Sequence, residues 1–413
     1  MPATLFTNIK QLVNVRAQTP ALRGNDMAVL PCIEDAWLLI EDDTIAACGP
    51  MNQLPSVNYQ LSTVNCSGRF ILPAWCDSHT HLVFAASREA EFIDKIKGLS
   101  YAEIAARGGG ILNSARKLAE TGEDELFRQA SVRLEELSRL GTGAIEIKSG
   151  YGLSVEAELK MLRVIKRLKA SSPVTIKASF LGAHTYPLPY KDNHQGYIDI
   201  IINEMLPAIA GEKLADYIDV FCEEGFFSPE ETMTICRAGK GYGLKPKLHA
   251  NQLHLSGGVQ AGVALEAVSV DHLETMDEDA IRSLAGSSTI GTLLPTAAFF
   301  LRMPFQPARA LVQAGCAIAL ASDFNPGSSP SGNMNLVVSM ACIQMKLLPE
   351  EAINAATLNG AHAMELGQEL GSITVGKKAN LILTRPIPSL AYLPYAFGSN
   401  LVEKVMLKGE WVE

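Results

Sequence analysis

The stretch ILPAWCDSHTHLVF, residues 71–84, joins an apolar run typical of a buried strand to a polar cluster that contains His79 and His81. Side chains alternate between the two faces of a strand, so residues two apart point the same way, about 6.6 Å apart along the strand axis. Two imidazoles at one strand end can therefore bind a single divalent ion. The alternative is a pair of polar residues that caps a strand where it meets solvent.

Seven further apolar runs follow from about residue 143, each separated from the next by a polar or glycine-rich break and a helical stretch. They are GAIEIKS, VTIKASFLGAH, YIDVFCEE, KPKLHAN, AVSVDHL, STIGTLLP and CAIALASD. Intervening segments such as VEAELKMLRVIKRLKA have the 3.6-residue period of amphipathic helices. Counted with RFILPAWCDSHTH, residues 69–81, the runs predict an α/β fold with a (β/α)8 TIM barrel. A doubly wound open sheet with an extra lobe is the alternative.

The two ends of the chain have a different pattern, because they contain short strands separated by turn residues, such as LFTNIKQLVNV and GSITVGKKANLILT. Neither end alone could bury a sheet face. We therefore expect one small β-sandwich domain built from both termini, residues 1–70 and 368–413, beside a barrel of residues 71–367. Within the barrel, residues 82–142 are interpreted as an elaborated first connection with two helices, around SYAEIAARGGG and EDELFRQASVRLEELSRL.

The composition limits the classes of partner. The 413 residues have a formal charge of −9, and phosphate binding needs a basic face, so we expect no nucleic-acid partner. The eight cysteines are scattered without a C-x-x-C pair, which indicates a reducing, cytoplasmic location. No signal-peptide pattern opens the chain and no uncharged apolar run reaches about 18 residues, so we expect no membrane partner. We include a homodimer of this chain among the assemblies that we expect.

Five of the eight histidines lie at the C-terminal ends of predicted strands, and Asp323 ends the last one. These histidines are His79, His81, His184, His249 and His272. A barrel gathers its C-terminal strand ends around one mouth, where barrel enzymes carry out their chemistry. Three neutral nitrogens, from His79, His81 and His249, and the carboxylate of Asp323 form a ligand set that suits zinc or iron.

The number of metal ions follows from the strand ends. A two-metal site would need a bridging group, often a modified lysine, on the fourth strand, but that strand ends VFCEEG with Glu223 and no lysine. Lys148 on the second strand is the other candidate bridge, although a lysine there more often solvates its ammonium or pairs with a carboxylate. We therefore expect one Zn2+ or Fe3+ per chain, with a bound water that becomes hydroxide near neutral pH.

Several motifs carry a family resemblance. HTH after the first strand, a histidine on the fifth, DHLE on the sixth and SDFNPGS on the eighth resemble the amidohydrolase superfamily. Within it, SHTHLVFAASRE, EIKSGYGL, FLGAH, KLHANQ and DFNPGSSP resemble the family of hydrolases that open the imidazolone ring in histidine degradation. The likeness covers essentially the whole chain, in order and with matching spacing. The barrel and composite β-domain of that family agree with the architecture inferred above.

The resemblance implies a reaction. Metal-bound hydroxide attacks the ring carbonyl of 4-imidazolone-5-propanoate, a small anionic substrate, and the product is N-formimidoyl-L-glutamate. Arg88 is implied to bind the propanoate, since a guanidinium matches a carboxylate with two hydrogen bonds. The alternative for Arg88 is a surface pair with Glu91 or Glu89. The other implied substrate contacts are Tyr151, His184, Gln252, Asn325, Gly327 and Ser328.

The same resemblance implies catalytic roles for His272, Asp323 and His184. His272 is the implied partner of the nucleophilic water and Asp323 relays the proton, while the choice of base between them stays open. His184 and Gln252 would hydrogen-bond the ring. Gln252 stands where some members of the family carry glutamate, and an amide cannot take up a proton, so residue 252 is not assigned as a base.

Two other functions stay open. One is a different mononuclear amidohydrolase, either a nucleobase-type deaminase or a hydrolase of another cyclic amide, in which Arg88 would contact something else. The other is a catalytically silent metal-binding barrel, which is disfavoured because all four ligands and His272 are present. The remaining histidines, His194, His254 and His362, are interpreted as structural or solvated.

Overall fold

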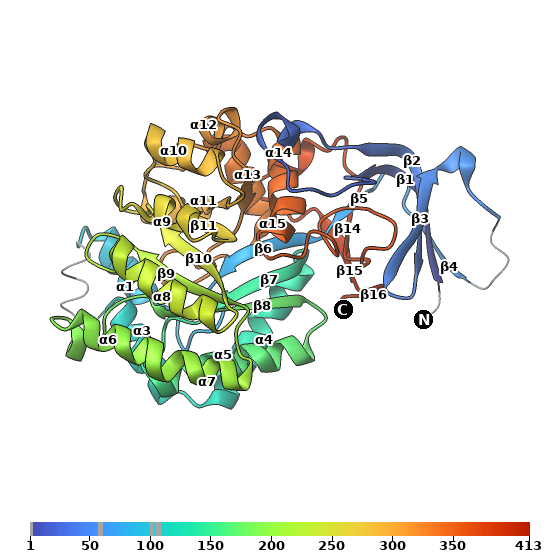
Figure 1. Ribbon diagram of the computed structural model, residues 1–413. Helices are drawn as coiled ribbons and strands as arrows, with labels where there is room; N and C mark the ends of the chain where they lie inside the picture. Colours follow the sequence, from blue (N-terminus) through green and yellow to red (C-terminus); the bar gives the residue numbers. More distant parts are fainter. Residues whose placement is uncertain (1–2, 57–60, 100–102, 104–108) are drawn as a thin grey trace.

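The computed structural model describes the chain except residues 1–2, 57–60, 100–102 and 104–108, and it contains two large sheets (Figure 1). Eight parallel strands pair with their neighbours in sequence order from β6 to β13. They are β6 (Trp75–Thr80), β7 (Thr142–Lys148), β8 (Thr175–Ala183), β9 (Tyr217–Cys222), β10 (Lys245–Ala250), β11 (Ser269–His272), β12 (Ile290–Leu293) and β13 (Ile318–Leu320). This confirms the predicted TIM barrel.

Helices cover the outside of the barrel (Figure 1). They are α1 (Glu89–Ile96), α3 (Ile111–Glu120), α4 (Glu123–Arg139), α5 (Val155–Ser171), α6 (His194–Ile200), α7 (Leu206–Glu212), α8 (Pro229–Gly241), α9 (Gly258–Ala264), α10 (Glu278–Ala285), α11 (Pro295–Leu301), α12 (Ala308–Gln313), α13 (Met334–Met345), α14 (Pro349–Ala356) and α15 (Leu358–His362), with α16 (Tyr392–Tyr395) near the C-terminus. Their burial follows the helical period: α4 buries Leu126, Ala130, Leu134 and Leu137.

The second sheet, here called the terminal sheet, combines both ends of the chain. Its strands are β1 (Ala3–Val13), β2 (Cys32–Glu41), β3 (Thr44–Pro50), β4 (Leu61–Asn65), β5 (Phe70–Pro73), β14 (Leu381–Thr384), β15 (Val402–Leu407) and β16 (Glu410–Trp411). The order is β16-β15-β14-β5-β1-β2-β3, and β4 pairs with β1. The two ends meet where β14 runs antiparallel to β5, so one domain is built from both termini, as predicted. The boundaries at 70/71 and 367/368 stay predictions.

The predicted first strand, residues 69–81, is split between the two sheets. Its first part is β5 of the terminal sheet, and its second part is β6 of the barrel. Pro73 has no amide hydrogen and ends the first ladder, and the amide of Ala74 then donates to the carbonyl of Asn380 at 2.9 Å. The prediction of one strand was wrong because FILPAW is an uninterrupted apolar run, and a change of sheet leaves no polar break in it.

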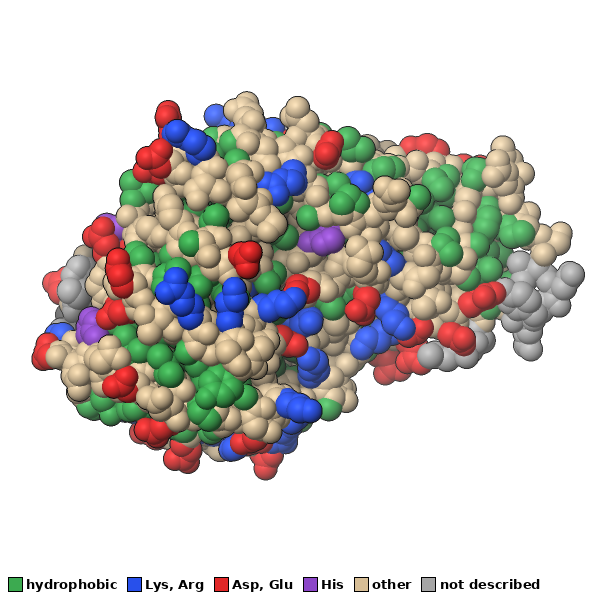
Figure 2. Space-filling view, viewed as in Figure 1, with side chains coloured by type: hydrophobic (Ala, Val, Ile, Leu, Met, Phe, Trp, Pro, Cys, Tyr) green, Lys and Arg blue, Asp and Glu red, His purple; other side chains and the backbone are tan. Residues whose placement is uncertain are grey.

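The first connection contains α1, α3 and α4. Of the two predicted helices, the one in EDELFRQASVRLEELSRL is α4, whereas most of SYAEIAARGGG lies outside the described residues. On the face shown in Figure 2, acidic and basic side chains are interspersed over the barrel. A helix able to cross a bilayer is absent from the part of the chain that the structure describes.

The barrel closes between its first and last strands through a few hydrogen bonds that also hold the predicted ligands. The Asp77 carboxylate accepts from the Ser322 amide at 2.9 Å. The Asp323 amide donates to the His79 carbonyl at 3.0 Å, and the His81 amide donates to the Phe324 carbonyl at 2.9 Å. Barrel closure therefore fixes Asp323 beside His79 and His81.

Candidate metal centre and active site

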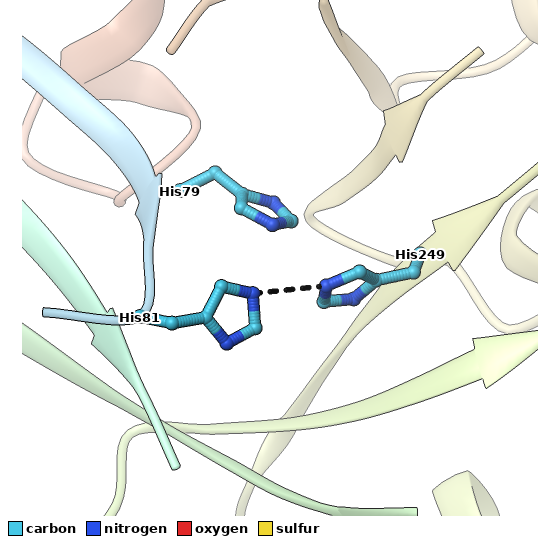
Figure 3. Close-up of side chains that lie close together, drawn as sticks. All are labelled: His79, His81 and His249. Atoms are coloured by element: carbon cyan, nitrogen blue, oxygen red, sulfur yellow. Dashed lines mark hydrogen bonds between the residues drawn. The ribbon is translucent and has the colours of Figure 1, made fainter. Parts of the chain in front are cut away.

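Four buried side chains converge inside the mouth of the barrel. His79 and His81 come from the end of β6, His249 from β10, and Asp323 from the residues after β13. The Nε2 atoms of His81 and His249 lie 3.3 Å apart (Figure 3). Asp323 Oδ1 lies 3.5 Å from Nε2 of His79 and 3.6 Å from Nε2 of His81. The structure thus brings together all four predicted ligands.

Two aspartates orient two of the imidazoles. Nδ1 of His79 lies 2.7 Å from Oδ2 of Asp271, and Nδ1 of His249 lies 3.1 Å from Oδ1 of Asp219. Each Nδ1–H donates to its carboxylate, which leaves the Nε2 lone pair free. Nε2 of His79 is buried and has no hydrogen-bond partner among the described residues. A buried nitrogen without a hydrogen-bond partner, next to other atoms that can bind a metal, is typical of a metal ligand.

The spacing and charge of the donor set also fit a metal. Ligands about 2.0–2.1 Å from a tetrahedral ion lie roughly 3.3 Å from one another, close to the separations found here. Burial, followed by the surrounding Lys148 and histidine charges, lowers the pKa of His79 well below its ordinary value, and burial likewise lowers the pKa of His81 and His249. Neutral imidazoles are the form that binds a metal. The residues therefore fit a metal cofactor.

His272 stands on the other side of this cluster, at the end of β11. One of its ring nitrogens lies within 4.8 Å of ligand atoms of both His79 and Asp323. Its backbone has φ of +88°, in the left-handed region that non-glycine residues adopt infrequently. Nδ1 of His272 lies 3.4 Å from Oε1 of Glu274, and the same oxygen accepts from Nε2 of Gln306 at 2.9 Å. The ring is thus held in place by a buried carboxylate and an amide.

For both His272 and Asp323, burial and the neighbouring charges shift the pKa in opposite directions. Burial by itself would lower the pKa of His272, but the Glu274 carboxylate raises that pKa above its ordinary value. Burial raises the pKa of Asp323 to about 6, although His272 and the Ser328 hydroxyl oppose the shift. A pKa of about 6 brings the Asp323 carboxyl within reach of proton transfer at neutral pH.

Arg88 lies at the start of α1 and reaches the loop after β13. Its Nε donates to Oε2 of Glu91 at 2.9 Å, so the predicted alternative pair with Glu91 is present. The guanidinium also packs directly on Gly327, where any side chain would collide with it. Its charge contributes to lowering the pKa of His184, which burial mainly shifts to about 4. Arg88 therefore lies against the loop that also carries Asp323.

His184 and Tyr151 form an aromatic wall beside His81. The His184 ring is stacked on His81 with centroids 5.4 Å apart, and the Tyr151 centroid is 5.7 Å from that of His81. Nδ1 of His184 donates to the Gly150 carbonyl at 2.9 Å, which leaves its Nε2 as an acceptor. Gln252 follows β10, is half-buried, and its side chain has no hydrogen-bond partner within the described part of the chain.

Asn325 and Ser328 are engaged in holding their own loop. Nδ2 of Asn325 donates to the Asp323 carbonyl at 2.6 Å and to the Ser328 hydroxyl at 2.7 Å. The Ser328 hydroxyl in turn donates to Oδ2 of Asp323 at 3.1 Å. These bonds fix the carboxylate of Asp323, a role that the sequence reasoning did not include, and substrate contacts by Asn325, Gly327 and Ser328 stay predictions.

Sequence reasoning missed three residues behind the histidines: Asp219, Asp271 and Gln306. The available signal was a carboxylate inside a buried strand, in YIDVFC and SVDH, because such a group needs a partner. Lys148 forms ion pairs with carboxylates, which was one of the two alternatives to a bridging role. The histidines interpreted as structural bind elsewhere: His254 to Glu223 and His362 to the Thr19 carbonyl.

Sequence comparison gives close relatives along the full chain. The model of the amidohydrolase family matches residues 228–412. An imidazolonepropionase of Flavobacterium johnsoniae is 59% identical over 408 residues, which are 98% of this chain and 99% of that protein. An imidazolonepropionase of Thermoanaerobacter pseudethanolicus is 41% identical over 402 residues, 97% of this chain and 96% of that protein.

Solved structures with the same fold are more distant in sequence. A triazine hydrolase variant superposes with a TM-score of 0.76 at 16% identity, covering 99% of this chain and 94% of that one. Escherichia coli guanine deaminase superposes with a TM-score of 0.75 at 14% identity, covering 100% and 99%. These structures support the fold, and the full-length relatives establish the family. The chain belongs to the imidazolonepropionases of the amidohydrolase family.

Proposed function

We propose that the protein hydrolyses the ring amide of 4-imidazolone-5-propanoate to N-formimidoyl-L-glutamate, with one Zn2+ or Fe3+ held by His79, His81, His249 and Asp323. Water adds to the ring carbonyl carbon, the ring C–N bond breaks, and the departing nitrogen takes up a proton. The observation that carries the proposal is the convergence of four buried candidate ligand atoms, 3.3 to 3.6 Å apart where measured, beside a loop that Arg88 also contacts.

The metal ion, when bound, supplies Lewis-acid chemistry and lowers the pKa of a coordinated water. His272 is proposed as the group that takes up the proton of the nucleophile. Its Nδ1–H faces Glu274, so Nε2 is the nitrogen left to accept a proton. Asp323, held by Ser328, is proposed to pass that proton toward the leaving nitrogen.

The substrate's two polar ends have matching groups. Arg88 is proposed to bind the propanoate, and its side chain is nearly buried, which strengthens a charge-assisted contact. His184 presents Nε2 as an acceptor for a ring N–H. Tyr151 and Gln252 are also proposed to contact the ring, Tyr151 through the aromatic wall that it forms with His184.

The free thiols of all eight cysteines agree with a reducing compartment, and we propose a cytoplasmic location. A homodimer and the lack of a nucleic-acid partner stay predictions.

The test measures product and metal on one sample. Purified protein should consume 4-imidazolone-5-propanoate, form N-formimidoyl-L-glutamate and contain about one equivalent of metal. Two equivalents, or none in active protein, would contradict the mononuclear site. Release of ammonia without the ring-opened product would instead support the deaminase alternative.

A further inference from the structure

A buried cluster of charged side chains lies beneath the metal ligands, and Lys148 is at its centre. Nζ of Lys148 lies 2.5 Å from Oε1 of Glu146, 2.7 Å from Oδ2 of Asp219 and 3.5 Å from Oδ2 of Asp271. Each of these side chains has no measurable exposure. One ammonium group therefore contacts carboxylates from β7, β9 and β11 at once.

Two of these carboxylates are the ones that orient metal ligands. The other oxygen of Asp219 accepts from the Nδ1–H and the backbone amide of His249. Asp271 accepts from Nδ1–H of His79 through the same Oδ2 that faces Lys148. A continuous path thus runs from His249 through Asp219, Lys148 and Asp271 to His79. The lysine connects imidazoles that come from strands on different sides of the site.

The charge of the cluster explains why the lysine is needed there. Glu146, Asp219 and Asp271 supply three carboxylates, and Lys148 and Lys247 supply two ammonium groups. A buried ion without a partner costs several kcal/mol, so the two aspartates would not keep their places beside each other without a cation between them. Burial alone would lower the pKa of Lys148, but Asp219, Glu146 and Asp271 together raise it above its ordinary value.

We infer that Lys148 is a positioning residue for the metal centre. By holding Asp219 and Asp271, it directs the Nε2 atoms of His249 and His79 toward the same point. The inference rests on the metal site of the proposed function. It predicts that the lysine controls metal affinity although it is not itself a ligand. Partners of metal-binding histidines typically change metal affinity by roughly 10- to 100-fold when removed.

Lys247 provides a matched control in the same barrel interior. It is equally buried, and it shares Glu146 with Lys148. It also donates to the carbonyl oxygens of Ser78 and Ala363, each at 3.1 Å, and its ammonium lies 5.4 Å from the centroid of the Tyr217 ring. Among the described residues it makes no ion pair with Asp219 or Asp271. Removing its charge therefore disturbs the same buried cluster without touching the carboxylates behind the ligands.

The experiment compares Lys148→Met with Lys247→Met. Each full-length variant is stripped of metal, its thermal midpoint is measured, and Zn2+ is then titrated against a competing chelator. Both substitutions should lower the midpoint of the metal-free protein. Only Lys148→Met should weaken Zn2+ binding, by roughly 10- to 100-fold, whereas Lys247→Met should remain close to wild type.

A second comparison tests the path itself. In a background that already carries Asp219→Asn and Asp271→Asn, the loss of Zn2+ affinity caused by Lys148→Met should shrink, because coupled residues are not additive. If Lys148→Met does not fold, Lys148→Gln carries the same expectation, since it keeps a donor but no charge. Equal losses for the two lysine variants, or an unchanged affinity in Lys148→Met, would overturn the inference. A wild-type protein that binds no Zn2+, Fe3+ or other transition metal would instead overturn the proposed function, and the inference with it.

Discussion

The interior of the barrel and the interior of the terminal sheet are equally buried but chemically opposite. The terminal sheet packs Phe6, Ile9, Leu12, Leu38 and Ile40 at 0–1% exposure. At the same exposure the barrel holds side chains that carry charge, namely Glu146, Lys148, Asp219, Lys247 and Asp271. Replacing apolar side chains by buried ions gains little or no stability.

The difference teaches which part of the molecule is organised for stability and which for chemistry. An apolar core needs only shape and volume, whereas buried ions must each face a partner. In the barrel those partners lead to His79 and His249. Substitutions in the two interiors should therefore separate loss of activity from loss of stability, and the following predictions test that separation.

Removal of a ligand should have the largest effect. His249→Ala should lose the metal, and its turnover should fall to the rate measured without enzyme. Three remaining ligands hold the ion less well, and the substitution leaves Asp219 without the imidazole that it binds. Metal content by elemental analysis and product formation measure this. His194→Ala is the control: His194 contacts Glu231 outside the site, so this variant should keep both. A fully active His249→Ala protein would show that the metal centre does not lie in the barrel interior.

His272→Asn should come next. Loss of an acid or base typically costs about 10²- to 10⁴-fold in kcat, and kcat/KM should fall in parallel because the interaction strengthens in the transition state. Metal content should stay near wild type, since four other ligands complete the site. A variant that purifies without metal would make His272 a ligand, and one with full turnover would leave it no role.

In the terminal sheet the expected effect is on stability alone. Leu38 is fully buried and faces Phe6 across the β1–β2 pair. Leu38→Ala should lower the free energy of unfolding by about 2–5 kcal/mol through lost burial and a cavity. Denaturant titration measures this, and kcat at a temperature where the variant is folded should be unchanged. A selective loss of metal or of kcat would show that the two interiors are coupled.

The comparison also explains how much could be predicted from the sequence. Strand runs and strand-end histidines are local patterns, so the barrel, the terminal sheet and the convergence of the four candidate ligands could be predicted. The partners of the ligands could not, because they are set by cross-strand geometry: His79 and its Asp271 are 192 residues apart in sequence. Likewise, hydrogen bonds from the turn residues Asn325 and Ser328 fix the carboxylate of Asp323. The amino-acid composition of a turn does not indicate such bonds.

Arg88 gives the smallest effect and the sharpest test of specificity. The guanidinium lies against Gly327, in the same loop as the candidate ligand Asp323. Arg88→Ala should therefore weaken substrate binding by about 1.5–3 kcal/mol, the typical contribution of a hydrogen bond to a charged group. Metal content should not change, because the arginine contacts no ligand of the metal among the described residues.

Arg88→Lys keeps the charge but loses the two-pronged geometry, so KM should fall between wild type and Arg88→Ala. Glu91→Gln is the matched control, since it removes the charge of the carboxylate that pairs with the guanidinium and leaves the guanidinium itself. If Arg88→Ala lost metal at an unchanged KM, the carboxylate of the substrate would have to bind elsewhere.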